Sequence, residues 1–382
     1  MTATTAQATP GEPTAEADRA EQNARAARRI RRGARLIALA AAGSLTLGAA
    51  AYESTHDDPD PTTASSSASS ASSAELSPGT AAGPADENAT DVSATAPGPH
   101  PFTGRLTHRG RVLAVKFDNA RGARPHHGLD QADLVYVEKV EGGMSRLMGV
   151  YSSSRPRSLG PVRSARESDV ELLKQFGRPV LAYSGVRSSL AKFLRRSPIH
   201  IRPHGKVPRA YFRANDRQAP HNLFVKPWSV LRTAPAAPKT SLAKDIGFRF
   251  GPAPRGGKRA WMRSVNYSAA RHSFRWSPKW KKWMVSFDGV PARLTSGKQM
   301  SARTIVIQKV LMRPSKYRDV NGAVTPYIHT VGRGTATVLR DGKAYDTVWK
   351  RPSAAGGTTF SLKNGTPMNF ARGQVWIVFA DR

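Results

Sequence analysis

Two glutamates beside a glycine pair have the residue type and spacing for bond-cleaving chemistry. Glu138 and Glu141 fall at the end of a predicted strand and run into Gly142-Gly143. Side chains three residues apart on a regular strand point to opposite faces, whereas a glycine bend could turn Glu141 into a cleft. Two carboxylates about 5–9.5 Å apart suit glycosidic cleavage by acid plus base or nucleophile. We therefore predict Glu138, Glu141 and His221 as catalytic candidates, with ion pairing of both acids to arginines as the alternative.

A second candidate site is a set of arginines that suits an anionic ligand. The predicted ligand-binding residues are Asp118, Asn119, Arg124, Arg146, Arg163, Arg166 and Asn222. The planar fork of arginine favours two-point capture of a carboxylate or phosphate. Asp and Asn at strand ends and in loops lie where ligands are usually met, although both are also common turn formers. The competing interpretation is that nearby carboxylates hold these arginines in ion pairs.

Tryptophans interleaved with lysines form a third pattern. The aromatic members are Trp261, Trp276, Trp280 and Trp283, and the basic ones are Lys279, Lys281 and Lys282. Aromatic faces next to cations can stack on sugars or on the bases of single-stranded nucleic acid. Tryptophan in a small β domain is more often part of the core, so both interpretations stay open.

The sequence offers little support for metal or cofactor chemistry. The chain has no cysteine, which excludes disulfides, thiolate metal sites and a cysteine nucleophile. His126 and His127 are adjacent and would point apart on an extended chain, while Pro203 disfavours a helix that would bring His200 and His204 together. Because no glycine-rich phosphate-binding loop is present either, we predict no metal site and no cofactor.

Positive charge is concentrated in the C-terminal three quarters of the chain. Of the 59 Lys and Arg residues, 52 lie in 100–382 together with 15 of the 27 acidic residues, a net charge of +37. Such an excess attracts polyanions, which include nucleic acid, anionic lipid and anionic cell-wall polymers. The choice among them depends on the side of the membrane on which this part lies.

The N-terminal residues predict a membrane-targeting segment. Six arginines between Arg25 and Arg35 precede the apolar run 36–52, and acidic residues follow it, so residues 1–35 are expected in the cytoplasm and the rest outside. The run is near the lower length limit for a single-pass transmembrane anchor. Cleavage of a signal peptide near Ala51 is the alternative and would give a secreted protein. Residues 53–99 are small, polar and acidic, and predict a disordered linker.

The remaining sequence predicts an α+β fold. Strand-like runs at 112–118, 132–141, 146–153 and 179–184 alternate with helical spacing at 163–176 and around 190–194, which favours a mixed α/β N-terminal domain at 100–250. Beyond about residue 255 helical periodicity disappears and short β-rich runs recur. A β-rich C-terminal domain at 258–382 is therefore expected, with a hairpin turn at Asp341-Gly342.

Four longer motifs carry a family resemblance. They are FDNARGARPHHGLDQADLVYVEKVEGGMSR (117–146), GPVRSAR (160–166), APHNLF (219–224) and GQVWIVF (373–379). Together they resemble the YerB-like family of bacterial envelope lipoproteins over about 101–382. The resemblance implies a mixed α/β domain, then a β-rich domain, and residence on the outer face of the membrane, but no established activity. Because the chain has no cysteine to lipidate, a peptide anchor is expected to replace the lipid.

Two functions follow as the main expectations. The first is a tethered envelope protein that binds an anionic wall polymer, peptidoglycan or a wall-synthesis protein. The second is a peptidoglycan-active enzyme that cleaves glycan strands with Glu138 or Glu141. Nucleic-acid binding suits the charge but not the predicted topology.

Overall fold

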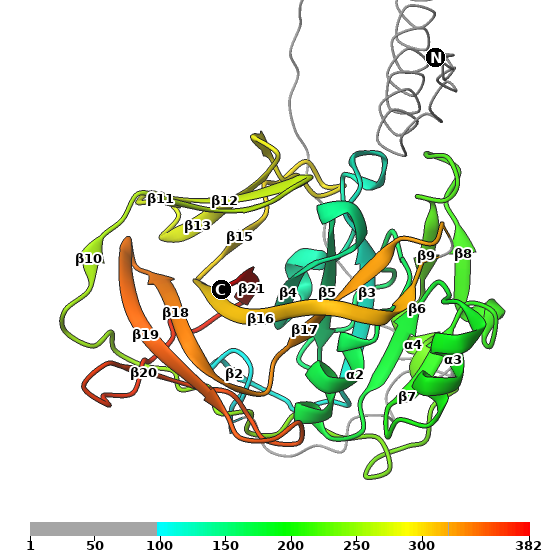
Figure 1. Cartoon of the computed structure of the whole chain (residues 1–382), viewed down its shortest axis with the longest axis horizontal. Helices are drawn as coiled ribbons and strands as arrows, with labels where there is room; N and C mark the ends of the chain where they lie inside the picture. The colour runs from blue at the N-terminus through cyan, green and yellow to red at the C-terminus, as the bar shows by residue number, and fades with distance from the viewer. Residues whose placement is uncertain (1–97, 320) are drawn as a thin grey trace, which may run out of the picture. The chain divides into compact units, whose positions relative to one another are not determined.

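The computed structural model describes residues 98–319 and 321–382, and strands are the main regular secondary structure of this part (Figure 1). The strands before residue 250 are β1 (Gly98–Pro99), β2 (Leu106–Thr107), β3 (Leu113–Asp118), β4 (Leu134–Lys139), β5 (Ser145–Tyr151), β6 (Val180–Tyr183), β7 (His200–Pro203), β8 (Tyr211–Arg213) and β9 (Leu223–Val225). The α-helices are α2 (Ser168–Leu173), α3 (Ser188–Arg195) and α4 (Pro227–Arg232). Short 3₁₀ turns are η1 (Arg121–Ala123), η2 (Leu129–Gln131), η3 (Glu141–Gly143), η4 (Lys174–Phe176) and η5 (Pro208–Ala210).

The second half of the chain adds only strands to the described structure. They are β10 (Lys258–Arg259), β11 (Met262–Tyr267), β12 (Ala270–Ser277), β13 (Lys282–Phe287), β14 (Val290–Pro291), β15 (Ser301–Ala302), β16 (Thr304–Arg318), β17 (Val324–His329), β18 (Gly332–Arg340), β19 (Lys343–Arg351), β20 (Thr359–Leu362) and β21 (Val375–Asp381). Asp341 and Gly342 both have positive φ between β18 and β19, as the predicted hairpin turn requires.

One 12-stranded sheet runs through both halves of the sequence. Its main order is β10-β19-β18-β16-β21-β4-β5-β3-β6-β7. The C-terminal strand β21 lies in the middle and pairs in parallel with β16 on one side and β4 on the other. The last strand of the chain therefore joins the first half of the fold to the second.

This sheet is buried on both faces around β3 and β4. Leu113, Val115 and Phe117 of β3 belong to one hydrophobic cluster, while Ala114 belongs to the other. Nearly continuous apolar runs are typical of strands covered on both sides, and LAVKFD and LVYVEK are such runs. The charged exception is Lys116, which points to the same face as Ala114 and is fully buried.

A smaller sheet of five strands, β11 to β15, forms the second layer of the C-terminal half. Trp283 of β13 is fully buried and packs against the half-buried Trp276 across the β12–β13 pair. Trp261 and Trp280 are exposed instead. The tryptophan pattern therefore divides into core and surface members.

The predicted mixed α/β character of residues 100–250 is wrong. The three α-helices there are only six to eight residues long, and the strands of this half hold more residues than its α-helices do. The expected helix at 163–176 begins only at Ser168, because the backbone before it is extended and bonded to strands: the Arg163 amide donates to the Lys116 carbonyl, and Ser184 donates to Arg163. Apolar spacing alone did not reveal this pairing.

The predicted cytoplasmic segment (1–35) and transmembrane anchor (36–52) and nearly all of the predicted linker (53–99) lie outside the described residues, which begin at residue 98. Among the helices of 98–319 and 321–382, none combines the length and apolar character needed to cross a membrane.

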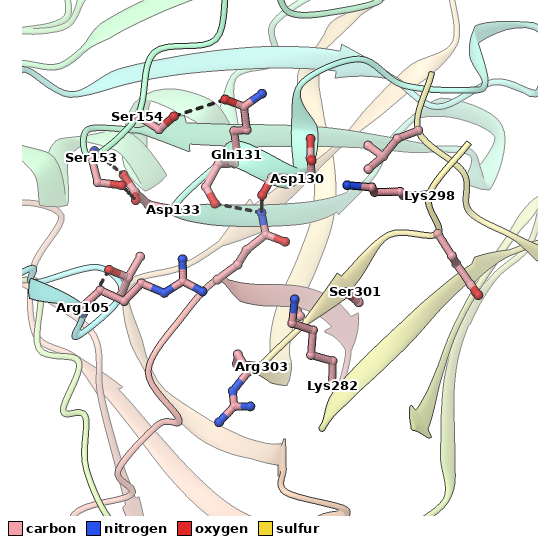
Figure 2. Close-up of a pocket in the computed structure, with 16 residues that line it drawn as sticks. Arg105, Asp130, Gln131, Asp133, Ser153, Ser154, Lys282, Lys298, Ser301 and Arg303 are labelled. Atoms are coloured by element: carbon pink, nitrogen blue, oxygen red, sulfur yellow. Dashed lines mark hydrogen bonds between the residues drawn. The ribbon is translucent and has the colours of Figure 1, made fainter. Parts of the chain in front are cut away.

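The two edges of the large sheet differ in chemistry. The strands β3, β4 and β6 run in the same direction and end on one side of the sheet, where the antiparallel strand β5 begins; this side is called one edge here. Asp118, Glu138 and Arg146 lie at these strand ends. At the opposite edge, segments before β4, β16 and β21 and after β5 surround a polar cavity of about 440 Å³ (Figure 2). The first edge holds the residues that the sequence singled out.

Candidate functional site

Asp118 is the centre of the site because four donors converge on its carboxylate. Arg146 Nη1 lies 3.2 Å from Oδ1, and Arg163 Nε lies 3.3 Å from Oδ2. His221 Nδ1 lies 2.8 Å from Oδ2, and the Ala120 amide donates to Oδ1. Burial alone would raise the pKa of Asp118, but Arg146, the amide and His221 outweigh it and hold the pKa below its ordinary value. A buried carboxylate thus orients two arginines and one imidazole.

Strand register places Arg146 between two acids. On β5 it lies directly across from Asp118 of β3 and Glu138 of β4. Cross-strand neighbours are close enough for their side chains to interact. Arg146 bonds Asp118, whereas Glu138 turns to Lys116.

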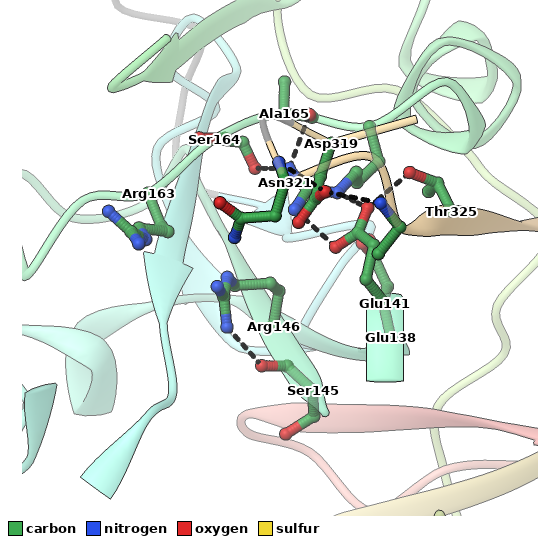
Figure 3. A network of polar contacts seen from close by, with 12 residues as sticks. Glu138, Glu141, Ser145, Arg146, Arg163, Ser164, Ala165, Asp319, Asn321 and Thr325 are labelled. Atoms are coloured by element: carbon green, nitrogen blue, oxygen red, sulfur yellow. Dashed lines mark hydrogen bonds and ion pairs between the residues drawn. The ribbon is translucent and has the colours of Figure 1, made fainter. Parts of the chain in front are cut away.

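Both arginines on Asp118 have N–H groups without a partner among the described residues, and Arg163 is the more exposed of the two. Arg146 is 5% exposed, and its Nε is buried without a hydrogen bond in the described structure. Arg163 has 29% of its side chain exposed, and only its Nε has an ion-pair partner among the described residues. Both guanidinium groups contact the Asp118 carboxylate, and Figure 3 draws both side chains. Two cations share one carboxylate, so the cluster retains positive charge and free N–H groups.

Asn119 and Arg124 form a neighbouring group. Arg124 donates to the Asn119 side chain and carbonyl, pairs with Asp288 at 2.9 Å and lies over the Phe287 ring. Asn119 in turn donates to Ser145 Oγ at 2.9 Å. These residues line one wall of a cleft of about 600 Å³.

Glu141 is held by a two-point ion pair. Arg166 Nε and Nη2 each lie 2.6 Å from its oxygens, and Thr325 of β17 also donates to it (Figure 3). Burial opposes ionisation, but Arg166 outweighs it and keeps the pKa of Glu141 below its ordinary value. The glycine pair does bend the chain, since Gly142 and Gly143 have φ of 63° and 72°. The bend turns Glu141 toward an arginine.

Glu138 belongs to a separate buried cluster. Lys116 Nζ contacts Glu138 and lies 2.7 Å from Asp169 Oδ1, and all three side chains are at most 3% exposed. Burial raises the pKa of Glu138, and the charge of Asp169 adds to the rise that Lys116 opposes. Burial is the main cause of this rise, and one cation shared between two carboxylates does not offset it.

The structure brings some predicted residues together and separates others. Asp118, Arg146, Arg163 and His221 form one cluster. The three catalytic candidates do not meet at one point, because each has a different partner: Lys116 for Glu138, Arg166 for Glu141 and Asp118 for His221. Asn222 instead accepts from Arg213 at 2.7 Å and donates to the Ala214 carbonyl on the β8–β9 ribbon, so within the described part its side chain bonds this ribbon and not Asp118.

Residues from far along the chain complete the site, and sequence reasoning missed them. The β16–β17 hairpin reaches across the first half, where Ser315 and Tyr327 bond Glu167 and Glu171 (Figure 1). Its tip residues Asp319 and Asn321 appear in the same close view as Arg146 and Arg163 in Figure 3. Lys116 had a visible signal, as a lone charge in an apolar strand. Nothing local marked the hairpin residues.

The described residues give no support for a bound metal ion. Among 98–319 and 321–382, no three His, Cys, Asp or Glu side chains are grouped so that they could hold one. The polar chemistry of the site is that of arginine, carboxylate and imidazole.

Comparison with known proteins agrees with this architecture. Residues 102–241 match the N-terminal domain, and residues 263–377 the C-terminal domain, of a protein family of unknown function, DUF3048. The chain belongs to this family. Every residue of the Asp118 cluster lies within the N-terminal DUF3048 domain, whereas Thr325 lies within the C-terminal one.

A curated relative and a solved structure are also similar to this chain. The chain is 24% identical over 295 residues to the Bacillus subtilis (strain 168) protein named "Putative lipoprotein YerB", covering 72% of this chain and 84% of that protein. The crystal structure of YerB from Bacillus subtilis matches with a TM-score of 0.63, covering 73% of this chain and 95% of that one. At 24% identity, this second likeness shows a shared fold.

Proposed function

We propose that this DUF3048 chain is an envelope-associated protein, tethered to the membrane through residues 36–52, that binds an anionic group of a wall polymer at the Asp118 cluster. The observation that carries the proposal is the pair of arginines on one buried carboxylate. Asp118 fixes Arg146 and Arg163 in place, and both keep unused N–H donors. A preorganised guanidinium pair suits a carboxylate or phosphate.

Location supports a wall ligand over an intracellular polyanion. The relative's name describes a lipoprotein, and the arginine-rich segment before 36–52 favours an outer position for the folded part. The net charge of +37 in 100–382 would raise the local concentration of any anionic wall component. A wall-synthesis protein with an acidic surface is the other partner that this charge suits.

The test measures binding of inorganic phosphate and acetate to the full chain, purified in mild detergent, by titration calorimetry. Arg163→Gln should weaken anion binding about tenfold, since it removes a charge-assisted donor pair. Arg178→Gln, an exposed arginine away from the cluster, is the matched control. Equal affinity in wild type and Arg163→Gln would exclude the cluster as the anion site. Sedimentation with isolated cell walls at low salt then tests the polymer.

One observation favours a second candidate, a peptidoglycan-active enzyme. His221 Nδ1 bonds Asp118 at 2.8 Å, and its Nε2 has no hydrogen-bond partner among the described residues. A carboxylate that orients an imidazole leaves the second nitrogen able to act as a general base. The partners of Glu138 and Glu141 leave those acids less available.

The enzyme candidate predicts soluble fragments from purified sacculi. Wild-type full chain should release them, His221→Gln should not, and Glu141→Gln should retain release if the histidine carries the proton. A wild-type reaction without new fragments, scored by mass spectrometry, would rule this candidate out.

A further inference from the structure

A cationic groove lies at the edge of the large sheet opposite to the Asp118 cluster. Arg105, Lys282, Lys298 and Arg303 line its 440 Å³ cavity, and Figure 2 shows the first three pointing toward the same space. Asp133, on the opposite wall, already accepts the amides of Ser152 and Ser153. The side chains of Lys282 and Lys298 form no ion pair within the described residues. Asp130 also lines the cavity, so its walls carry four cationic side chains against two carboxylates and keep a net positive charge.

A second hollow, which contains an exposed tryptophan, shares lining residues with this cavity. Lys282, Lys298, Gln299 and Ser301 line both spaces, and the second, of about 620 Å³, is bounded by Trp280. Because they share these four residues, we treat the two hollows as one groove. Trp280 is 61% exposed at the turn between β12 and β13, and Lys279 Nζ lies 5.3 Å from its ring. A large aromatic face kept in solvent at a bend is not explained by packing.

We propose that this groove binds an extended anionic polysaccharide, with Trp280 stacking on a sugar ring and the lysines and arginines contacting its acidic groups. Hydroxyl and amide side chains suited to sugar hydroxyls also line it, including Ser154, Gln131 and Gln299. The groove uses none of the Asp118 cluster. The six-residue strand β4 separates the two edges by about 20 Å, so the sites can be tested independently.

A glycan fits this groove better than single-stranded nucleic acid. Nucleic-acid grooves hold successive bases on several aromatic platforms. Trp280 is the one tryptophan lining the described groove, since Trp283 is buried and Trp276 packs against it. One platform with many polar groups matches a sugar chain whose other units are held by hydrogen bonds and charge.

The experiment uses the full chain in mild detergent and follows binding of de-esterified polygalacturonate by microscale thermophoresis. Polyglutamate is the anionic probe without sugars, dextran the neutral sugar, and oligo(dT) the nucleic acid. Trp280→Ala should weaken polygalacturonate binding about tenfold and leave polyglutamate binding nearly unchanged. Lys282→Gln combined with Lys298→Gln should weaken both polyanions.

The chain supplies close controls. Trp261→Ala removes a tryptophan that is 62% exposed but does not line the groove, and Lys363→Gln removes an exposed lysine elsewhere. Both should bind like wild type, and circular dichroism checks that each variant is folded.

Three results would overturn the assignment. Equal polygalacturonate binding by Trp280→Ala and Trp261→Ala would show that Trp280 does not stack on a sugar ring. Loss of polygalacturonate binding in Arg163→Gln, with binding kept in the groove variants, would place the polysaccharide at the Asp118 cluster instead of the groove. Tighter binding of oligo(dT) than of polygalacturonate replaces the glycan by nucleic acid.

Discussion

Replacing Lys116 by methionine should be among the most destabilising single changes in this protein. The Lys116 ammonium is fully buried, contacts Glu138 and lies 2.7 Å from Asp169. Methionine fills similar space without the charge. It leaves two buried carboxylates facing each other without a cation, and breaking a buried ion pair from one side costs about 3–5 kcal/mol. We expect a loss of that size in the free energy of unfolding of Lys116→Met at pH 8.

The loss should depend on pH in a defined direction. The folded pKa of Glu138 is raised, mainly by burial, so the folded state holds its proton more tightly than the unfolded state. Stability therefore falls as pH rises from the ordinary glutamate pKa toward the raised one. Removing Lys116 increases that rise, so Lys116→Met should be closest to wild type near pH 4.5 and furthest from it at pH 8.

Urea denaturation of the full chain, followed by tryptophan fluorescence at both pH values, measures this effect. Lys139→Met is the control, because Lys139 is a half-buried lysine on β4 with no ion pair to another described residue. Adding Glu138→Gln to Lys116→Met should recover part of the stability by removing one buried charge. A loss below about 1 kcal/mol, or one independent of pH, would refute the account of the cluster.

Two further perturbations test the architecture. Glu141→Gln should cost about 1.5–3 kcal/mol at pH 7 by breaking the two-point pair with Arg166. Because the pKa of Glu141 is lowered in the folded state, this contribution is full above the ordinary glutamate pKa and declines as the pH falls through the lower folded one, so urea denaturation should show a difference from wild type that shrinks as the pH is lowered. Deleting residues 375–382 should expose β4 and β16 together, so limited proteolysis should cut both halves at one rate; survival of an intact N-terminal fragment would contradict the single-sheet interpretation.

The strands were predictable because their apolar runs are nearly unbroken. The runs at 112–118, 132–141, 146–153 and 179–184 correspond to β3, β4, β5 and β6. The helical content was overestimated because Val170, Leu172, Leu173 and Phe176 lie close to one another in any compact segment. Their spacing does not show that the preceding residues pair with β3.

The candidate site was partly visible for a related reason. Asp118 and Arg146 stand at the end of one predicted strand and the start of another, where polar groups meet in an antiparallel pair. Their joint contact with His221 depends on a segment 103 residues away, and the bond from Thr325 to Glu141 spans 184 residues. No local pattern encodes which strand lies beside which.

The position of β21 explains why two family domains behave as one structure. A parallel strand needs neighbours on both sides to satisfy its backbone groups, and β21 takes one from each domain. Because β4, β21 and β16 run in the same direction, the end of β4 that carries Glu138 and the far end of β16 lie on the same side of the sheet. The hairpin partner of β16, β17, supplies Thr325 there. The C-terminal DUF3048 domain thus supports the anion site without providing any of the groups on Asp118. Changes on β17 should alter the stability of the site more than its choice of ligand.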